Sequence, residues 1–266
     1  MAAVLAAVAV AAAPAVAAYA GQLGSVPTGN DVSYPQCTGT LPSGQAFGIV
    51  DVNDGLANTT NPCLAAEITW AENSTGAARQ PEVSLYVNTA NPGNHKVSDW
   101  PVNNTDPVTG NRVKDPYGTC AGKNNPACAW QYGWDMADLD AQTRGVQDPG
   151  SYRWWLDVET VNSWQSSAQS NRADLEGMAS YFRHIGAKSG IYSTVKQWDP
   201  IVGTVRSSSP LFGLPSWIPG AKTLANAEKN CRLAPLVHGG TVTLTQWTTK
   251  SGNSDFSCPA SSPKAK

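Results

Sequence analysis

Short runs of apolar residues recur along the chain and are separated by amphipathic or polar segments. The run FGIVDVN at residues 47–53 is typical, because an apolar stretch of strand length ends in polar side chains. Runs of this length, rich in β-branched and aromatic residues, predict buried strands. The predicted strands are residues 47–53, 82–94, 152–160, 188–194, 214–220 and 239–249.

Amphipathic segments between these runs predict helices. The first segment begins with Asn-Pro, and proline is favoured in the first turn of a helix. The last segment has Asn171 as its predicted N-cap and Gly186 as its predicted stop. The predicted helices are residues 61–73, 127–145 and 171–186.

The order of these elements predicts the fold class. Strands that alternate with helices along a chain predict a parallel sheet with crossover helices. Six such strands over ~240 residues favour a closed, TIM-like (β/α) barrel of the α/β class over an open sheet. We therefore predict a single barrel domain at residues 21–262, with a long loop at residues 95–128 and a solvated tail at residues 263–266.

Residues 1–20 are almost wholly alanine and valine. A transmembrane anchor needs ~20 strongly apolar residues, and this Ala-rich stretch with Pro14 is a weak candidate. A core helix would have no polar face. Ala-Tyr-Ala before Gly21 favours a secretory signal peptide, although a positively charged start is missing. We therefore expect a secreted protein, with possible attachment to the cell wall and no membrane association after cleavage.

Composition and charge narrow the classes of partner. Charged residues make up 14% of the chain, well below the usual ~25%. The formal net charge is -2, and no basic stripe or charged tail indicates a nucleic-acid partner. Ten tryptophans and many Asn, Ser and Thr residues suit an uncharged polar ligand such as a sugar. We expect the protein to be a monomer.

Six cysteines agree with export, because an even number of cysteines in a secreted chain usually forms disulfides. Reduced core thiols are the alternative. A metal site is disfavoured, because no Cys-x-x-Cys occurs and none of the three histidines lies at ligand spacing to another. Among about 15 possible pairings, Cys120–Cys128 is the best single prediction because it closes a short loop. The sequential set is completed by Cys37–Cys63 and Cys231–Cys258.

Two carboxylates interrupt the predicted apolar strand YRWWLDVET. Asp157 and Glu159 share one face, because successive strand residues point to opposite faces. The active site of a (β/α) barrel lies at the C-terminal ends of its strands, where this pair is placed. Burial among Trp154, Trp155 and Trp164, together with the second carboxylate, would raise the pKa of one carboxyl, as general acid catalysis requires. The alternative is a pair that caps a helix or holds a salt bridge.

Further motifs follow one another along the chain. Asp31, Ser33 and Gln36 form D-x-S-x-x-Q near the front of the domain. The D-x-E pair, the GIY strand, the SWI strand and the TQW strand come next, and an aspartate follows in GNSDF. In these motifs and their order, over about residues 29–258, the chain resembles the family 25 glycoside hydrolases, the Chalaropsis-type lysozymes.

The resemblance implies a barrel hydrolase, without cofactor or metal, that cleaves the β-1,4 bond between N-acetylmuramic acid and N-acetylglucosamine in peptidoglycan. Glu159 would be the general acid/base, Asp157 would polarise the substrate 2-acetamido group or stabilise charge, and Asp31 would line the same pocket. Other substrate-facing residues would be Tyr86, Tyr192, Gln246 and Asp255, with Trp217 and Trp247 as sugar-stacking walls. The two tryptophans fit the role of barrel-core aromatics equally well.

The chain also departs from the family pattern. The third strand of family members ends in an aromatic-His-aromatic signature, whereas LYVNTANPG keeps only Tyr86. The W-I-A-x-Y strand reads WIPGA here, and residues 95–128 look like an insertion with two cysteines. A barrel that binds wall glycan without catalysis, and a hydrolase of a different glycan, therefore stay open as alternatives. Asp31, Asp157 and Glu159 together favour catalysis, since a pure binder needs no acid.

Overall fold

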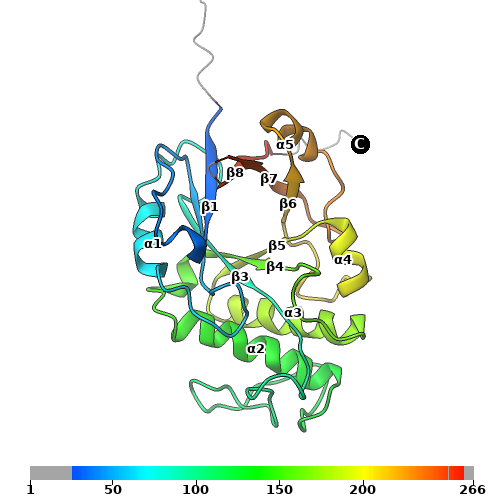
Figure 1. Ribbon diagram of the computed structural model, residues 1–266. Coiled ribbons are helices and arrows are strands. Elements are labelled where there is room, and N and C mark those ends of the chain that lie inside the picture. Colours follow the sequence, from blue (N-terminus) through cyan, green and yellow to red (C-terminus); the bar gives the residue numbers. More distant parts are fainter. Residues whose placement is uncertain (1–25, 251, 261–266) are drawn as a thin grey trace, which may run out of the picture.

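Eight strands close into a barrel, as the order of elements predicts (Figure 1). The computed structural model describes residues 26–250 and 252–260, so the predicted signal peptide and the predicted tail lie outside the described residues. Each strand pairs with the next along the chain, and the eighth pairs with the first. The strands are β1 (Thr28–Val32), β2 (Gly48–Asp51), β3 (Val83–Asn88), β4 (Arg153–Asp157), β5 (Lys188–Tyr192), β6 (Ser216–Ala221), β7 (Val242–Thr249) and β8 (Gly252–Ser257).

Helices cover the barrel unevenly. Two long helices lie side by side along one flank of the barrel, next to β3, β4 and β5 (Figure 1). Shorter helices cover other parts of the outer surface. The helices are α1 (Leu64–Glu72), α2 (Pro126–Gln142), α3 (Ala168–His184), α4 (Val195–Val202) and α5 (Leu224–Asn230).

The barrel departs from a regular (β/α) repeat where it closes. Strands β1 to β7 run parallel, whereas β8 is antiparallel to both of its neighbours. The described residues between β1 and β2 form a single 3-10 turn, Tyr34–Gln36, in place of a crossover α-helix. Side chains of β8 therefore lie beside those of β1. Although β8 runs in the opposite direction, it contributes side chains to the same end of the barrel as β1.

Sequence patterning located the apolar strands and the long helices but missed β1, β8, α4 and α5. The missed strands read TGNDV and GNSDFS, so neither carries the apolar run that marks a strand. The predicted N-cap Asn171 is wrong, because α3 begins earlier and Ser167 accepts the capping hydrogen bond from the Ser170 backbone N–H. Asn171 lies buried inside the helix, where its side chain donates to the backbone of Gln165 and Ile201.

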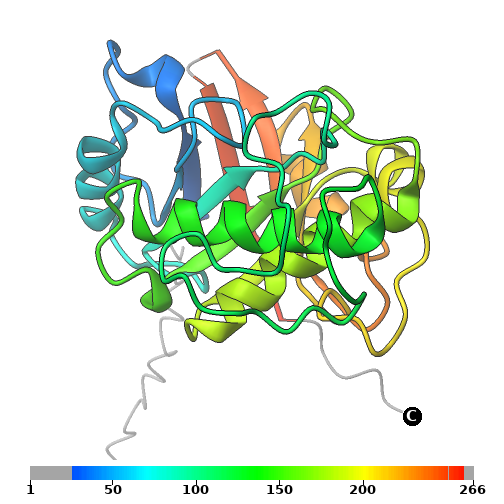
Figure 2. The same cartoon turned by 90° about the horizontal axis from the view of Figure 1, so that it is seen from below.

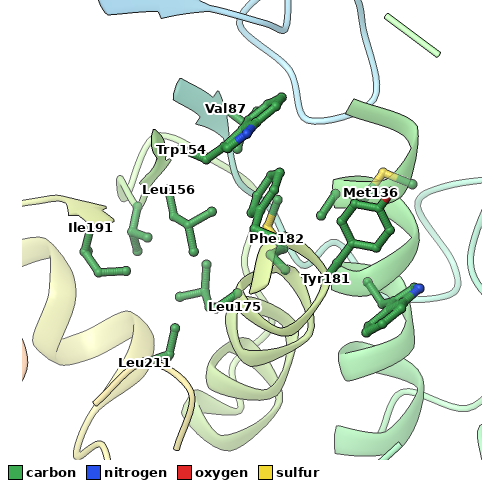
Figure 3. Close-up of a cluster of buried hydrophobic side chains, with 14 of the residues drawn as sticks. Val87, Met136, Trp154, Leu156, Leu175, Tyr181, Phe182, Ile191 and Leu211 are labelled. Atoms are coloured by element: carbon green, nitrogen blue, oxygen red, sulfur yellow. The ribbon is translucent and has the colours of Figure 1, made fainter. Parts of the chain in front are cut away.

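Alternation along the strands separates two hydrophobic cores. On β4, Trp154 and Leu156 point outward into the core shared with α2 and α3 (Figure 3). The ring centroids of Trp154 and Phe182 are 4.5 Å apart there. Trp155 points into the barrel, where it packs with Trp217 of β6. Successive side chains of a strand point to opposite faces, so every second residue of β4 lies inside the barrel.

Glycines make room for large rings inside the barrel. A Cβ at Gly190 would lie 2.3 Å from a ring carbon of Trp155, and a Cβ at Gly29 would lie 2.2 Å from a ring carbon of Phe47. Any larger residue would displace the rings that fill the interior, and overpacking of this kind is destabilising. The glycine of the GIY strand therefore has a packing role.

Two more glycines bring α2 and α3 into close contact. A Cβ at Gly133 would lie 1.9 Å from the Asp174 carbonyl oxygen, and a Cβ at Gly177 would lie 2.0 Å from the Trp130 carbonyl oxygen. Both clashes would involve helix backbone, which cannot move aside unless the whole helix shifts. The pair of glycines thus permits a crossing distance that any side chain would prevent.

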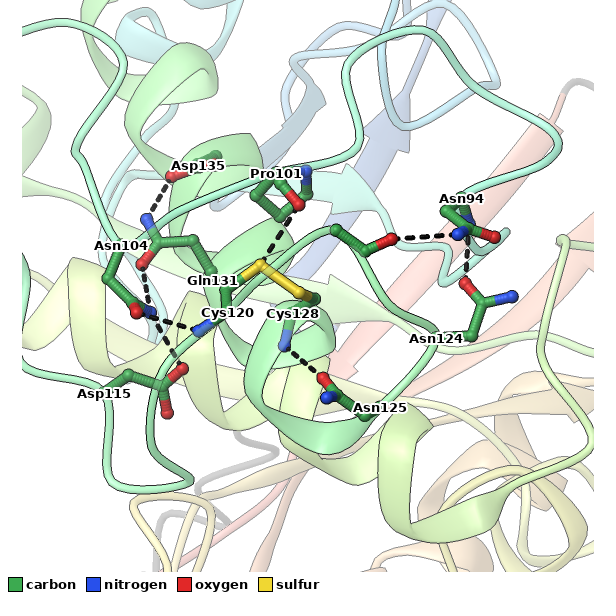
Figure 4. The surroundings of a disulfide bond; sticks show 11 residues. Asn94, Pro101, Asn104, Asp115, Cys120, Asn124, Asn125, Cys128, Gln131 and Asp135 are labelled. Atoms are coloured by element: carbon green, nitrogen blue, oxygen red, sulfur yellow. Dashed lines mark hydrogen bonds between the residues drawn. A yellow bond between two sulfur atoms is a disulfide. The ribbon is translucent and has the colours of Figure 1, made fainter.

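A long irregular segment, residues 95–125, runs across α2 and α3 on the outside of the barrel (Figure 2). We call this segment the insertion; it is shorter than the predicted loop, because α2 begins at Pro126. The side chain of Asn104 accepts from the Cys120 backbone N–H and donates to Asp115 and to Gln131 of α2 (Figure 4). Polar contacts beside the Cys120–Cys128 disulfide therefore tie the insertion to the helix.

The three disulfides are those of the predicted sequential set. They join Cys37 to Cys63, Cys120 to Cys128 and Cys231 to Cys258. Within the described residues, no helix has the length and apolar character that crossing a bilayer requires. Nor do the described residues contain a group of three or more His, Cys, Asp or Glu side chains arranged to hold a metal ion.

Replacing Gly177 with alanine is expected to destabilise the protein, because the new Cβ meets the Trp130 carbonyl oxygen of the facing helix. We expect a net loss of about 1–3 kcal/mol in the free energy of unfolding, measured by urea titration. Gln169→Ala on the exposed face of α3 is the control, with an expected change below about 0.5 kcal/mol. An unchanged free energy for Gly177→Ala would contradict the close crossing.

Stability is expected to fall as the pH rises through the neutral range. Burial raises the pKa of Asp135 to about 8, of Asp140 to about 7 and of Asp138 to about 6. In the unfolded chain, aspartates lose their protons near pH ~4. Between roughly pH 4 and pH 8 unfolding therefore releases protons, so a higher pH favours the unfolded state.

The melting temperature should thus be higher at about pH 5 than at about pH 8, as followed by circular dichroism. Asp135→Asn should reduce this difference, because asparagine stays neutral at both pH values. Asp199→Asn, at an exposed position of α4, is the matched control and should leave the difference unchanged. A melting temperature that rises with pH would contradict the assignment.

Candidate functional site

A cavity of about 230 Å³, here called the carboxyl cavity, opens at the C-terminal ends of the parallel strands. The last inward-facing residues of several strands point into it, as barrel geometry dictates. It also contains Asp51, Asn88 and Asn253, which sequence analysis did not single out. Seven of the nine predicted site residues line it: Asp31, Tyr86, Asp157, Glu159, Tyr192, Trp217 and Gln246.

Asp157 is the last residue of β4 and is only 5% exposed. Its Oδ1 has no hydrogen-bond partner in the described part of the chain. Burial raises the pKa of Asp157 well above its ordinary value, and the negative charges of Glu159, Asp51 and Asp31 raise it further. Burial and the neighbouring negative charges therefore both favour the protonated form of Asp157.

Glu159 faces the same cavity from two residues further along and is half-buried. Its Oε1 accepts a 3.1 Å hydrogen bond from Gln197 Nε2 of α4. Gln197 Oε1 accepts in turn from the Thr194 hydroxyl at 2.9 Å, which orients the amide so that its NH2 group faces Glu159. A neutral donor thus holds Glu159 in place. Sequence analysis did not assign Gln197, because it lies in a helix that the pattern did not reveal.

Asp31 projects from β1 and is held by neutral donors. Gln246 Nε2 donates to Asp31 Oδ2 at 2.9 Å, and Asn253 Nδ2 donates to Oδ1 at 3.1 Å. The Tyr192 hydroxyl donates to Gln246 Oε1 at 3.2 Å. Burial nevertheless raises the pKa of Asp31, because its effect exceeds that of these hydrogen bonds. Predicted residues from β1, β5 and β7 therefore form one connected network.

Asp51, at the end of β2, adds a fourth carboxyl to the cavity. It accepts from the Asn53 backbone N–H at 3.1 Å, and Asn88 Nδ2 lies 3.3 Å and 3.2 Å from its two carboxyl oxygens. Burial raises its pKa well above the ordinary value, and the charges of Asp140 and Glu67 raise it further. In the sequence, Asp51 is marked only by the polar end of the run FGIVDVN. The closed barrel is what places Asp51 beside the other carboxyls.

Aromatic rings lie beneath the carboxyls. The Trp217 ring packs edge-on against Tyr192, with centroids 4.5 Å apart, and against Trp155 at 5.8 Å. Tyr86 approaches Trp217 from β3 at 6.1 Å. Trp217 is only 2% exposed, so most of its ring belongs to the barrel core while one edge lines the cavity.

Two predicted site residues do not line the carboxyl cavity. Asp255 is fully buried and accepts a 2.8 Å hydrogen bond from Trp217 Nε1. Burial raises its pKa well above the ordinary value, and the negative charge of Asp31 raises it further. Trp247 follows Gln246 on β7, so its side chain points to the opposite face and lies outside the cavity.

The tryptophans near the D-x-E pair also differ from their predicted places. Trp154 faces the outer core, and Trp164 Nε1 donates to the backbone oxygen of Glu159 at 2.8 Å. Only Trp155 lies on the inner face that carries Asp157. Deep burial and neighbouring carboxylates, rather than a shell of three tryptophans, therefore raise the pKa of Asp157.

The charge balance of the carboxyl cavity is one-sided. It contains Asp31, Asp51, Asp157 and Glu159, and none of the described residues that line it is Lys or Arg. Crowding of carboxyls in a buried site favours the protonated form of some of them. The cavity can therefore present a protonated carboxyl and a carboxylate together, which is the pair that acid/base cleavage of an acetal requires.

Replacing Trp217 with phenylalanine is expected to lower the free energy of unfolding by about 1–3 kcal/mol, because buried Asp255 loses its indole donor. Urea unfolding measures this loss. Trp247→Phe, at a half-buried position outside the cavity, is the matched control and should cost less than about 1 kcal/mol. Equal losses in the two variants would show that the Asp255 hydrogen bond is not what distinguishes them.

Sequence comparison links the chain to lysozymes through the segment that carries the D-x-E pair. The family model described as Lysozyme-like protein 1 matches residues 144–217. A Dictyostelium discoideum protein named "Probable GH family 25 lysozyme 4" is 38% identical over 60 residues, which are 22% of this chain and 28% of that protein. The chain thus matches little more than a quarter of the length of this curated relative.

Solved structures extend the likeness to the whole fold. The bacterial lysozyme of Streptomyces coelicolor has a TM-score of 0.55 at 15% identity, and the match covers 90% of this chain and 94% of that one. A family GH25 lysozyme from Aspergillus fumigatus has a TM-score of 0.53 at 15% identity, over 88% and 94% of the two chains. Identities this low show a shared fold. The chain is thus similar to family 25 lysozymes in fold, and over a part of its length it is also similar to lysozyme-like proteins in sequence.

Proposed function

We propose that this protein is a glycoside hydrolase that cleaves β-1,4 bonds of peptidoglycan, or of a related N-acetylhexosamine glycan. The observation that carries the proposal is the meeting of Asp31, Asp157 and Glu159 in one open cavity at the strand ends. The muramidase and lysozyme names of the structural neighbours support the class of substrate.

Glu159 is the general acid/base in this proposal. It lies two residues beyond the end of β4 and is only half-buried, so it can reach a glycosidic oxygen. As acid it gives a proton to the leaving oxygen, and as base it then removes a proton from the attacking water. The neutral amide of Gln197 holds the side chain without stabilising one charge state as strongly as a cation would. This leaves both steps accessible to one group.

Asp157 orients the substrate 2-acetamido group and stabilises the positive charge that develops on it. Its high pKa keeps it protonated while no positive charge is near. A developing cation lowers the pKa of a neighbouring acid, so Asp157 gives its proton to solvent water in the open cavity as the positive charge develops. In a buried site the resulting ion pair is strong, and the stabilisation is greatest where the charge is greatest.

The remaining lining residues bind sugar. Asp31 and Gln246 offer hydrogen-bond acceptors and donors to ring hydroxyls, and Tyr86 and Tyr192 add phenolic hydroxyls on flat rings. Trp217 contributes one ring edge while it supports Tyr192. A small number of polar groups among aromatic side chains is typical of sites that bind small ligands.

We also propose that the protein is exported and acts as a monomer. Its Ala-rich first twenty residues resemble a signal peptide, and the three disulfides suit an oxidising compartment. A polysaccharide of the cell wall would then be its partner.

The test is a wall-clearing assay on purified residues 21–266, with release of reducing ends as the readout. Glu159→Gln should lower the rate by roughly 10²–10⁴-fold, as expected for loss of a general acid/base. Asp199→Asn, which removes an exposed carboxylate from α4, is the control and should retain the parent rate.

The alternative is a catalytically inactive barrel that binds glycan. The end of β3 favours it, because Val87 and Asn88 follow Tyr86 where family members complete an aromatic-His-aromatic signature, and Asn88 is engaged with Asp51. Binding to cell walls without release of reducing ends, equal in the parent and in Glu159→Gln, would establish this alternative.

A further inference from the structure

A second cavity, of about 560 Å³, lies outside the barrel between α3, the insertion and the segment that follows α4. It shares no lining residue with the carboxyl cavity. We call it the basic groove. The charged residues that line it are Lys114, Arg172, Arg183, Arg206 and Glu176.

The lining of the basic groove carries four cations and a single carboxylate, so its net charge is positive. Glu176, the one acid in the lining, accepts from the Tyr117 hydroxyl at 2.6 Å and from the Ser209 hydroxyl at 2.6 Å. In the part of the chain that the structure describes, the one ion pair joins Arg144 and Asp140. The four cations of the groove therefore have no ion-pair partner there, on a chain whose formal net charge is -2.

Two of these cations are spread along α3. Arg172 and Arg183 lie eleven residues apart on α3, which corresponds to about 16 Å along the helix axis. Lys114 approaches from the insertion, and Arg206 from the segment after α4. A single small anion cannot contact both ends of such a row, whereas a linear polymer with several anionic groups can.

Neutral hydrogen-bonding groups lie among the cations. Gln169 and Ser180 belong to the same face of α3 as the arginines, and Ser208 belongs to the opposite wall. Arginine pairs well with carboxylate and phosphate oxygens, and hydroxyls and amides pair with sugar hydroxyls. We propose that the basic groove binds a linear anionic polysaccharide.

The insertion supplies one wall of this groove through Lys114, Pro116 and Tyr117. The Tyr117 hydroxyl connects it to α3 through Glu176, and the Tyr117 backbone N–H donates to Asp115 Oδ1 at 2.7 Å. Asp115 in turn accepts from Asn104, which contacts the disulfide-bonded Cys120. The segment that departs from the family pattern is thus held firmly enough to form a binding wall.

A nucleic acid is the less favoured occupant. Proteins that bind nucleic acids neutralise many phosphates with broad basic surfaces. Here the basic residues of the groove belong to a chain with only 14% charged residues and an acidic net charge. The narrow row of cations suits a chain with sparse charges and many hydroxyls.

The experiment is a calorimetric titration of the full chain with an oligogalacturonate of about ten sugars, long enough to span the row. A neutral maltooligosaccharide of equal length, monomeric galacturonate and a short DNA duplex are the comparison ligands. We expect the oligogalacturonate to bind more tightly than all three, and added salt to weaken it. Arg183→Gln combined with Arg206→Gln should weaken the binding by about tenfold.

Lys222→Gln combined with Arg232→Gln is the matched control, because it removes the same charge from exposed positions outside the groove. It should change the affinity by less than about twofold, and circular dichroism checks that both variants are folded. Equal weakening in the two double variants would overturn the proposal, as would equal affinity for the neutral oligosaccharide. Tighter binding of the DNA duplex would assign the groove to nucleic acid instead.

Discussion

The packing of aromatic rings inside the barrel sets where the carboxyls lie at its mouth. Trp155 and Trp217 fill the interior, and Gly190 leaves the space that the Trp155 ring needs. Side chains alternate along a strand, so an inward ring at Trp155 requires an inward carboxyl at Asp157. A slip of one residue would turn Asp157 into the outer core and the ring out of the interior. The same packing thus determines both the stability of the barrel and the direction of its acids.

Neutral amides hold these acids in place. Gln197 contacts Glu159, Gln246 contacts Asp31, and Asn88 contacts Asp51. An amide fixes the geometry of a carboxyl but provides no opposite charge. For Asp31 and Asp51, burial therefore has a larger effect on the pKa than these hydrogen bonds. Buried acids with raised pKa values cost stability at neutral pH. Three disulfides and close packing between α2 and α3 contribute stability elsewhere in the fold.

The two cavities have opposite electrostatic character. The carboxyl cavity is built from strand ends and contains acids, whereas the basic groove is built from α3 and the insertion and contains cations. The carboxyl cavity is formed by the strands of the barrel. The basic groove is shaped in part by the insertion, a surface segment that a disulfide joins to α2. Functional variation is concentrated in loops, since loops change without disturbing the core. The insertion is therefore where this chain adds recognition to a fold that it shares with lysozymes.

Local sequence patterns were enough to locate the apolar strands, the barrel class, the short Cys120–Cys128 loop and the D-x-E pair. Each depends on neighbours in the chain, such as the alternation that aligns Asp157 with Glu159. They did not reveal β1 and β8, because these polar strands exist only through pairing with each other and with β2 and β7. Nor did they reveal the part played by Asp51 and Gln197 or exclude Trp247 from the cavity. Those outcomes depend on barrel closure, which brings side chains from distant segments into contact that no local pattern encodes.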